Sequence, residues 1–255
     1  MKIGVISDLH IGLPSSDTND FHFTERQILN FFEYIYTTCE VLVLNGDIFE
    51  CWEAIGLDLN IQKAQFQSII ACYPELNKYI TSHIENKTMI YIVGNHDEVV
   101  YRRQLFPDVK KYFVADKKVF IAHGHQVAKI NSNNSWIGKY ILCCLGHAEE
   151  IIFKEIDNTL DDVYILFARH ENKIYEKYAI TQFDKGATGV VFGHTHHPYV
   201  KKIGNKFYGN CGCWWGKKDY IDVILIDTKS DELLQYITLG EIDGQIIENI
   251  IPNLV

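Results

Sequence analysis

The stretch KIGVISDLH, residues 2–10, joins a short apolar run to two side chains that bind metals well. The first part is rich in Ile and Val, and it is typical of a β-strand that is buried on both faces. Asp8 and His10 follow immediately, at the point where that strand would end. A strand with this ending favours an α/β sheet that carries chemistry at its edge.

The same pattern, an apolar run that ends in polar residues, recurs four times. Asn45-Gly46-Asp47 follows EVLVL, Gly94-Asn95-His96-Asp97 follows TMIYIV, His123-Gly124-His125 follows KVFIA, and Gly193-His194-Thr195-His196 follows GVVF. One Asp after a strand is usually a turn residue or a helix cap. Because ligands of open α/β sheets bind beyond the carboxyl ends of the strands, five such endings predict one shared metal site.

The rest of the pattern predicts the fold class. Strands are predicted at 2–7, 40–45, 88–94, 118–123, 188–193, 206–210, 222–228 and 233–239. Apolar periodicity predicts helices over 24–38, with Thr24 as N-cap, over 61–73, and over 74–85, which begins at Pro74. Alternating strands and helices indicate an α/β architecture with helices outside the sheet, and the closely spaced last strands predict an antiparallel end.

One segment without strand signals interrupts this alternation. Residues 126–187 have helical patterns and are too long for a plain loop. We therefore expect residues 1–255 to form a single domain, with 126–187 as an inserted helical lid or cap. Two interpretations stay open, an additional packing layer and a lid that recognises substrate.

Composition narrows the class of protein. The chain has 33 acidic and 24 basic residues, a net charge of −9, so that no extended nucleic-acid surface is expected. A phosphorylated small molecule remains compatible, because bound metals reverse the sign of a pocket locally. The seven cysteines include no CxxC pair and are expected to be reduced. With no signal peptide or apolar stretch of ~20 residues in view, the cytoplasm is the predicted location.

The predicted ligands indicate the kind of metal. Carboxylate oxygens and imidazole nitrogens without thiolates suit Mn, Fe, Zn, Co or Ni. Seven protein ligands exceed one tetrahedral site, whereas two ions that share a bridging carboxylate account for the number. Paired ions ~3.5–4 Å apart serve displacement at phosphorus and supply a bridging hydroxide as the attacking group. We therefore expect two divalent ions, with Mn²⁺ first and the other four as alternatives.

The series DLH, NGD, GNHD, HGH and GHTH, which runs from residue 8 to 196, resembles the calcineurin-like metallophosphoesterase superfamily. The resemblance implies a two-sheet β-sandwich flanked by helices. It also implies ligands for one metal, namely Asp8, His10, Asp47 and His196, and for a second metal, namely Asp47, Asn95, His123 and His194. His96 would bind phosphate and protonate the leaving group, and Asp97 would orient the His96 ring. Asn95, His96 and nearby Arg102 are expected to bind substrate.

Within the superfamily, the chain is similar to the UDP-2,3-diacylglucosamine hydrolase-like group. NGDIFECW (45–52), the position of the insertion and NCGCWW (210–215) carry this similarity. His96 is a departure, because enzymes of that group typically have arginine there, whereas histidine is the pattern of the broader superfamily. The resemblance leaves His125 and His197 without an assigned role.

The expected function is a metal-dependent phosphohydrolase acting on a phosphorylated small molecule or nucleotide, such as a small phosphodiester. One alternative is a UDP-2,3-diacylglucosamine pyrophosphatase-like enzyme of lipid A synthesis, with peripheral membrane contact through the lid. A nuclease is another, for which Arg102-Arg103 and Lys110-Lys111 are the nearby basic residues. A non-catalytic scaffold is the least favoured, because no expected ligand is missing.

Overall fold

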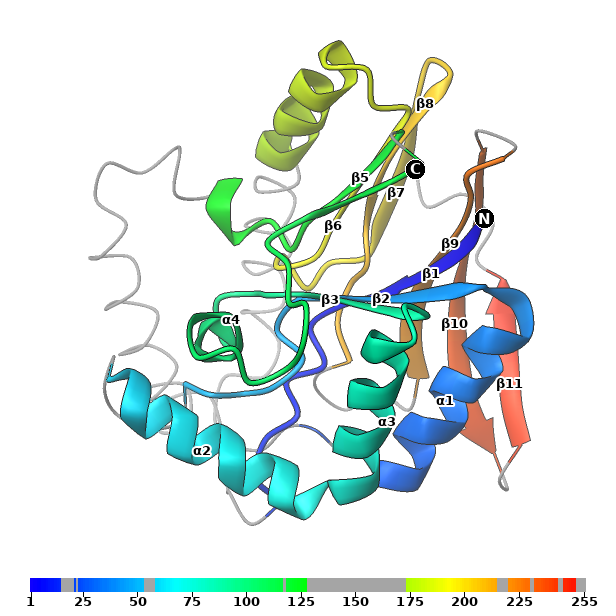
Figure 1. Cartoon of the computed structure of the whole chain (residues 1–255). Helices are drawn as coiled ribbons and strands as arrows, with labels where there is room; N and C mark the ends of the chain where they lie inside the picture. Colours follow the sequence, from blue (N-terminus) through cyan, green and yellow to red (C-terminus); the bar gives the residue numbers. More distant parts are fainter. Residues whose placement is uncertain are drawn as a thin grey trace, which may run out of the picture.

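The computed structural model describes residues 1–14, 21, 23–52, 58–116, 118–127, 173–214, 220–229, 232–242 and 245–250. These residues form two β-sheets with helices on their outer faces (Figure 1). The larger sheet has the strand order β11-β10-β9-β1-β2-β3, and the smaller one β4-β5-β6-β8-β7. The predicted class, a two-sheet α/β sandwich flanked by helices, is thereby confirmed.

The six-stranded sheet joins a parallel half to an antiparallel half. The parallel half consists of β1 (Lys2–Ile6), β2 (Val41–Asn45) and β3 (Met89–Ile92). On the other side of β1 lie β9 (Tyr220–Asp227), β10 (Glu232–Ile242) and β11 (Gln245–Ile250), each antiparallel to its neighbour. The expected antiparallel end of the chain is therefore present.

The five-stranded sheet has a parallel centre and antiparallel edges. Its strands are β4 (Phe113–Ala115), β5 (Val119–Ile121), β6 (Gly189–Phe192), β7 (Tyr199–Ile203) and β8 (Lys206–Asn210). All eight predicted strands occur, whereas β4, β7 and β11 were not predicted. The β7 sequence YVKKI gives no apolar run, because an edge strand tolerates lysines that protect its open side.

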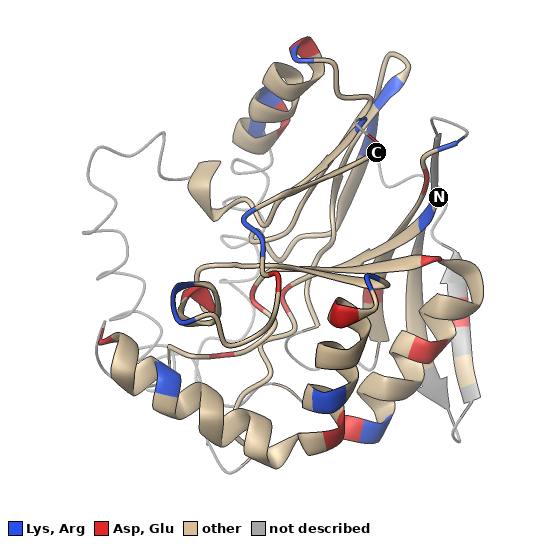
Figure 2. Cartoon of the chain, in the orientation of Figure 1, with Lys and Arg blue, Asp and Glu red and all other residues tan. Residues whose placement is uncertain are grey.

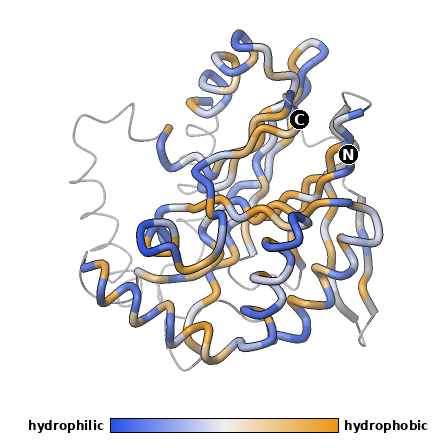
Figure 3. Tube along the Cα trace, in the orientation of Figure 1, coloured by the Kyte–Doolittle hydropathy of each residue, from blue (hydrophilic) through white to orange (hydrophobic). Residues whose placement is uncertain are grey.

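Hydrophobic cores lie on both faces of the larger sheet, a smaller one between the two sheets and a larger one beneath the helices, and strand alternation selects the residues of each. Ile3 and Val5 of β1 pack in one buried cluster with Ile121 of β5 and Val191 of β6. Ile6 belongs to a second cluster, on the opposite face of β1, together with residues of the helices. The central strands of both sheets are accordingly hydrophobic (Figure 3), as strands covered on both faces must be.

Helices cover the outer face of the larger sheet. They are α1 (Glu25–Thr38), α2 (Leu59–Cys72), α3 (Pro74–Glu85) and the short α4 (Glu98–Arg102), of which the first three were predicted. Thr24 is the N-cap of α1 as expected, because its side chain accepts from the Gln27 backbone while the Gln27 side chain accepts from Thr24 N. Pro74 occupies the first turn of α3.

Residues 128–172, most of the predicted insertion 126–187, lie outside the described residues. Residues 173–184 are helical and pack on the outer face of the smaller sheet (Figure 1). Tyr175, Ala179 and Phe183 form a buried cluster there with Val190 and Phe192. The lid function of the insertion stays a prediction. Among the described helices, none has the length and hydropathy to cross a membrane.

Trp214 links the core to the loop that carries Asp8. Its ring is 1% exposed and lies about 6 Å from the rings of Phe23, Phe31 and Phe32. Its main-chain N–H donates to the Asp8 carbonyl at 3.0 Å. The loop that carries Asp8 is thus fastened to an aromatic cluster in the core.

We expect Trp214→Ala to lower the free energy of unfolding by ~3–5 kcal/mol, because truncation of a buried aromatic leaves a cavity. Urea denaturation of the metal-free protein measures this change. Ile61→Ala on α2 is the control, since Ile61 is 44% exposed and its loss should cost within ~0.5 kcal/mol. A Trp214 variant as stable as this control would contradict the assignment.

Candidate metal centre

The loops that follow five strands meet at one place where the two sheets adjoin. The loop after β1 carries Asp8 and His10, the loop after β2 carries Asp47, and the loop after β3 carries Asn95 and His96. The smaller sheet contributes His123 after β5 and His194 and His196 after β6. Contacts between Asp8 and His196 and between Asp47 and His123 join the two sets. The structure therefore brings six of the seven predicted ligands together in two linked groups. The seventh, Asn95, precedes His96, whose backbone N–H donates to Asp47.

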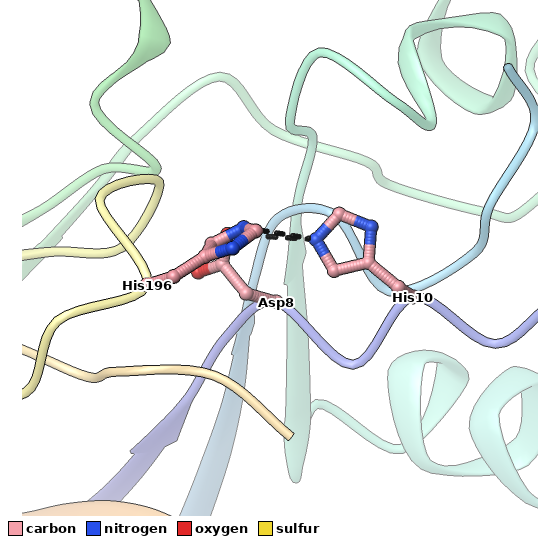
Figure 4. Close-up of side chains that lie close together, drawn as sticks. All are labelled: Asp8, His10 and His196. Carbon is pink, nitrogen blue, oxygen red and sulfur yellow. Dashed lines mark hydrogen bonds and ion pairs between the residues drawn. The ribbon is translucent and has the colours of Figure 1, made fainter. Parts of the chain in front are cut away.

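The first group consists of Asp8, His10 and His196, whose ligand atoms all lie within 4.8 Å of one another (Figure 4). His10 Nε2 is 3.1 Å from His196 Nε2, and both nitrogens face Asp8 Oδ1, at 3.9 and 3.3 Å. Asp8 is fully buried and His10 nearly so. Two imidazole nitrogens and a carboxylate oxygen directed at one point form a suitable site for a divalent transition metal.

The second group consists of Asp47, His123 and His194. His123 Nε2 lies 3.0 Å from Asp47 Oδ2, and its Nδ1 lies 2.9 Å from the Asn45 carbonyl. Since a carbonyl only accepts, Nδ1 carries the proton and Nε2 is the nitrogen available to a metal. The His194 backbone N–H donates to both Asp8 oxygens, at 3.2 and 3.0 Å, which ties this group to the first.

Asn95 adds an oxygen donor. It is buried, and its Oδ1 makes no hydrogen bond within the described part of the chain. A buried amide oxygen without a partner costs ~1–3 kcal/mol, which a bound cation would offset. Together with the two groups, this oxygen fits a centre of mixed oxygen and nitrogen donors.

The backbone of this site is strained. Positive φ angles occur at Asp8 (55°), His10 (50°), Asp47 (52°), His194 (71°) and His196 (56°). Each such conformation costs a non-glycine residue on the order of 1–3 kcal/mol and persists only when its surroundings impose it. Concentration of this strain on five of the seven predicted ligands indicates that their orientation is selected for function.

Two glycines allow the backbone to pass close to the carboxylates. A Cβ on Gly94 would overlap the Asp47 carboxylate and backbone, and one on Gly193 would overlap Ser7 Oγ and Asp8 Oδ2. Any larger residue at either position would displace a predicted ligand. The close contacts at these positions therefore require the glycines of GNHD and GHTH.

The charges of the site are complementary. Burial opposes ionisation of Asp8 and Asp47, but His123 and its neighbouring histidines hold the pKa of both carboxyls below the ordinary value. Burial would lower the pKa of His123, and the carboxylates of Asp47 and Asp8 instead raise it to about 10. Burial and the nearby His123 charge lower the pKa of His194 to about 3, so that this imidazole is neutral. Two ionised carboxylates and a neutral imidazole are ready to coordinate a cation, which would displace the Nε2 proton of His123 on binding.

His96 lies beside the first group, and its partner differs from the expected one. Its Nδ1 is 2.7 Å from Glu50 Oε2, whereas Asp97 accepts from Ile48 N, Gly94 N and the Tyr91 hydroxyl. The prediction that Asp97 orients the His96 ring is therefore wrong: Asp97 braces the loops, and Glu50 holds the ring. Glu50 was missed, although it stands three residues after Asp47 in NGDIFE.

Two aromatic residues, Trp52 and Tyr175, contact His96 and the loop of His123. Trp52 stacks on His96 with ring centroids 4.2 Å apart. Tyr175, from helix 173–184, donates its hydroxyl to the Gly124 carbonyl at 3.0 Å, next to His123. The last part of the predicted insertion thus supports the loop of the second group.

The remaining predicted residues take different places. Arg102 is exposed on α4, and its guanidinium donates to Glu98 of the same helix. His125 is buried with its ring 5.5 Å from that of His123, and His197 is half-buried. Arg102 as a substrate-binding residue stays a prediction without a contact that supports it.

Comparison with known proteins finds a family profile, a relative in sequence and similar solved structures. The profile of the family described as calcineurin-like phosphoesterase matches residues 1–198. A UDP-2,3-diacylglucosamine hydrolase of Haemophilus influenzae is 21% identical over 236 residues, which cover 84% of this chain and 94% of that protein. The solved phosphoesterase YfcE of E. coli is 17% identical, with a TM-score of 0.47 over 99% of this chain and 100% of that chain. Vps29 of Entamoeba histolytica, solved in complex with Zn²⁺, is 14% identical, with a TM-score of 0.46 over 98% of both chains.

Proposed function

The chain belongs to the calcineurin-like phosphoesterase family, and from this premise we propose that it hydrolyses a phosphoester or phosphoanhydride with two divalent cations at the site. Membership of this family makes it a hydrolase that acts on phosphoester bonds. The main support for the proposal is the pair of linked groups, Asp8–His10–His196 and Asp47–His123–His194.

The described contacts support a division of the ligands. Asp8, His10 and His196 would hold one cation, and Asn95, His123 and His194 the other, with Asp47 shared between them. Bound there, the cations would lower the pKa of a water between them and offset charge on the phosphoryl oxygens. Mn²⁺ is the first candidate, with Fe, Zn, Co and Ni as alternatives that suit the same donors.

His96 is suited to protonate the leaving oxygen. Burial would lower its pKa, but the carboxylates of Glu50 and Asp47 raise the pKa of His96 to about 9. The ring is therefore an imidazolium at neutral pH, and it is 25% exposed beside the first group. A cationic donor at this position assists departure of an alkoxide or phosphate leaving group.

This role of His96 predicts that the rate of hydrolysis falls at alkaline pH. With a raised pKa, the proton on His96 is held below about 9 and is lost as the pH rises through that value. Bound cations would lower this pKa. We therefore expect kcat for an alkyl phosphate ester to decline with rising pH at or below about 9 in the wild type, and this decline to be absent in His96→Asn. The same proton also contributes to the stability of the folded protein. This contribution is complete below the ordinary histidine pKa of ~6.5 and is lost as the pH rises through about 9. An identical decline of kcat in His96→Asn would contradict the role.

The substrate is proposed by class. The Haemophilus relative is named for UDP-2,3-diacylglucosamine, which makes a nucleotide-linked pyrophosphate of this kind the first alternative to a small phosphoester. A nuclease is less favoured, because basic and acidic residues are interspersed along the described helices α1 to α3 (Figure 2). The cytoplasmic location stays a prediction.

A hydrolysis panel tests the proposal. It comprises a phosphomonoester, a phosphodiester, UDP-2,3-diacylglucosamine and single-stranded DNA, each with Mn²⁺ and with chelator. We expect Mn²⁺-dependent turnover of at least one of the first three, faster than that of DNA. Dominant cleavage of DNA would support the nuclease. Failure with all four by protein that has bound its metal would support a non-catalytic role.

A further inference from the structure

One carboxylate oxygen contacts both His10 and His96. Glu50 Oε2 lies 3.0 Å from His10 Nδ1 and 2.7 Å from His96 Nδ1. The two rings meet edge to face, with centroids 4.7 Å apart and an interplanar angle of 88°. A predicted metal ligand and the predicted proton donor therefore share one acceptor atom.

Glu50 is itself held on several sides. Its N–H donates to the Ile11 carbonyl at 3.0 Å, so its backbone lies along the loop of His10. Its other oxygen, Oε1, accepts from Trp52 N at 2.8 Å, and its carbonyl accepts from Gln65 Nε2 at 3.0 Å. The side chain is 16% exposed. These contacts leave Oε2 in a defined position between the two rings.

Hydrogen-bond chemistry determines what this arrangement does to each ring. An ionised carboxylate only accepts, so both Nδ1 atoms must carry a proton. His10 then presents Nε2, the nitrogen that faces Asp8 and His196 (Figure 4), as a lone pair. On His96, the same contact fixes the ring plane, so that its Nε2 is the nitrogen directed away from Glu50.

We propose that Glu50 is a positioning residue that serves both the first cation site and His96, and thereby couples occupancy of that site to the orientation of the proton donor. The role of Glu50 toward His96 rests on the proposed function, whereas its role toward the first cation site rests on geometry alone. Loss of the carboxylate should have two separable effects. One is weaker binding of a single cation, and the other is a stronger dependence of turnover on the leaving group.

The variants are Glu50→Gln, which keeps the size of the side chain, His96→Ala, which leaves the contact to His10, and Glu40→Gln as an exposed control. Mn²⁺ is titrated calorimetrically into each metal-free protein. For Glu50→Gln we expect one of two affinities to fall ~10–100-fold, the usual cost of removing an outer partner of a metal ligand. His96→Ala and Glu40→Gln should bind as the wild type does. Unchanged affinities in Glu50→Gln would overturn the proposal.

Turnover supplies the second readout. The ratio of kcat for a p-nitrophenyl ester to kcat for an alkyl ester should rise at least tenfold in both Glu50→Gln and His96→Ala, and stay constant in Glu40→Gln. A rise in His96→Ala alone would overturn the coupling. If the wild type turns over neither ester, the proposed function fails. The calorimetry still tests whether Glu50 supports the first cation site.

Histidine ¹H–¹⁵N spectra of the wild type test the geometry without any variant or substrate. Both His10 and His96 should show a proton on Nδ1. A spectrum in which either ring has a bare Nδ1 would overturn the shared contact.

Discussion

Replacement of Asp47 by asparagine is expected to reduce hydrolysis at least ~100-fold, more than the ~10–100-fold that follows loss of an outer partner of a metal ligand. Asp47 Oδ2 faces His123 Nε2 at 3.0 Å, and Asp47 Oδ1 accepts from the His96 backbone at 2.8 Å. As the carboxylate proposed to serve both cations, it should also decide metal content. We expect the metal content of the dialysed protein, measured by elemental analysis, to fall from two ions per chain to fewer than one.

Asp108→Asn is the matched control, because Asp108 is exposed and pairs with Lys110 at the surface. It should retain metal and turnover. An Asp47 variant with wild-type metal content and activity within a few-fold of the wild type would contradict the shared role of Asp47.

The second large effect concerns His96. We expect His96→Ala to lower kcat for an alkyl phosphate ester ~10²–10⁴-fold, the usual range for loss of a general acid. A p-nitrophenyl ester should lose much less, because its leaving group departs without a proton. KM should change little for either ester if the ring acts mainly on the departing oxygen.

His83→Ala supplies the comparison for His96. His83 lies on α3, where its ring stacks between those of Tyr36 and Tyr79, outside every predicted motif. It should leave kcat for both esters unchanged. Equal losses with the two esters in His96→Ala would show that the ring does not protonate the leaving group.

Much of the fold could be predicted because its determinants are local. The parallel strands are buried on both faces, so that β1, β2 and β6 appear in the sequence as continuous apolar runs. The edge strands β4 and β7 could not be found in this way. The first has three residues, and the second is interrupted by two lysines, of which Lys202 is exposed and Lys201 pairs with Glu176.

The ligands of the site were predictable for a topological reason. Carboxyl ends of neighbouring parallel strands share an edge, so the endings after β1, β2 and β3 meet in one sheet and those after β5 and β6 in the other. The meeting of the two sets depends on how the two sheets pack, which the strand endings alone do not determine. Glu50 is different, since its function depends on His10 and His96, which lie 40 and 46 residues away in sequence. Asp97 shows the converse, because its neighbour in sequence, His96, is not the partner of its carboxylate.

The most direct test of the central claim is a titration of the metal-free wild type with Mn²⁺, followed by both calorimetry and hydrolysis of a phosphodiester. We predict two bound ions per chain and turnover that is absent without metal and complete when the second ion has bound. Two bound ions without hydrolysis of any phosphoester or phosphoanhydride would contradict the proposed function, and hydrolysis that persists in chelator would contradict the role of the site.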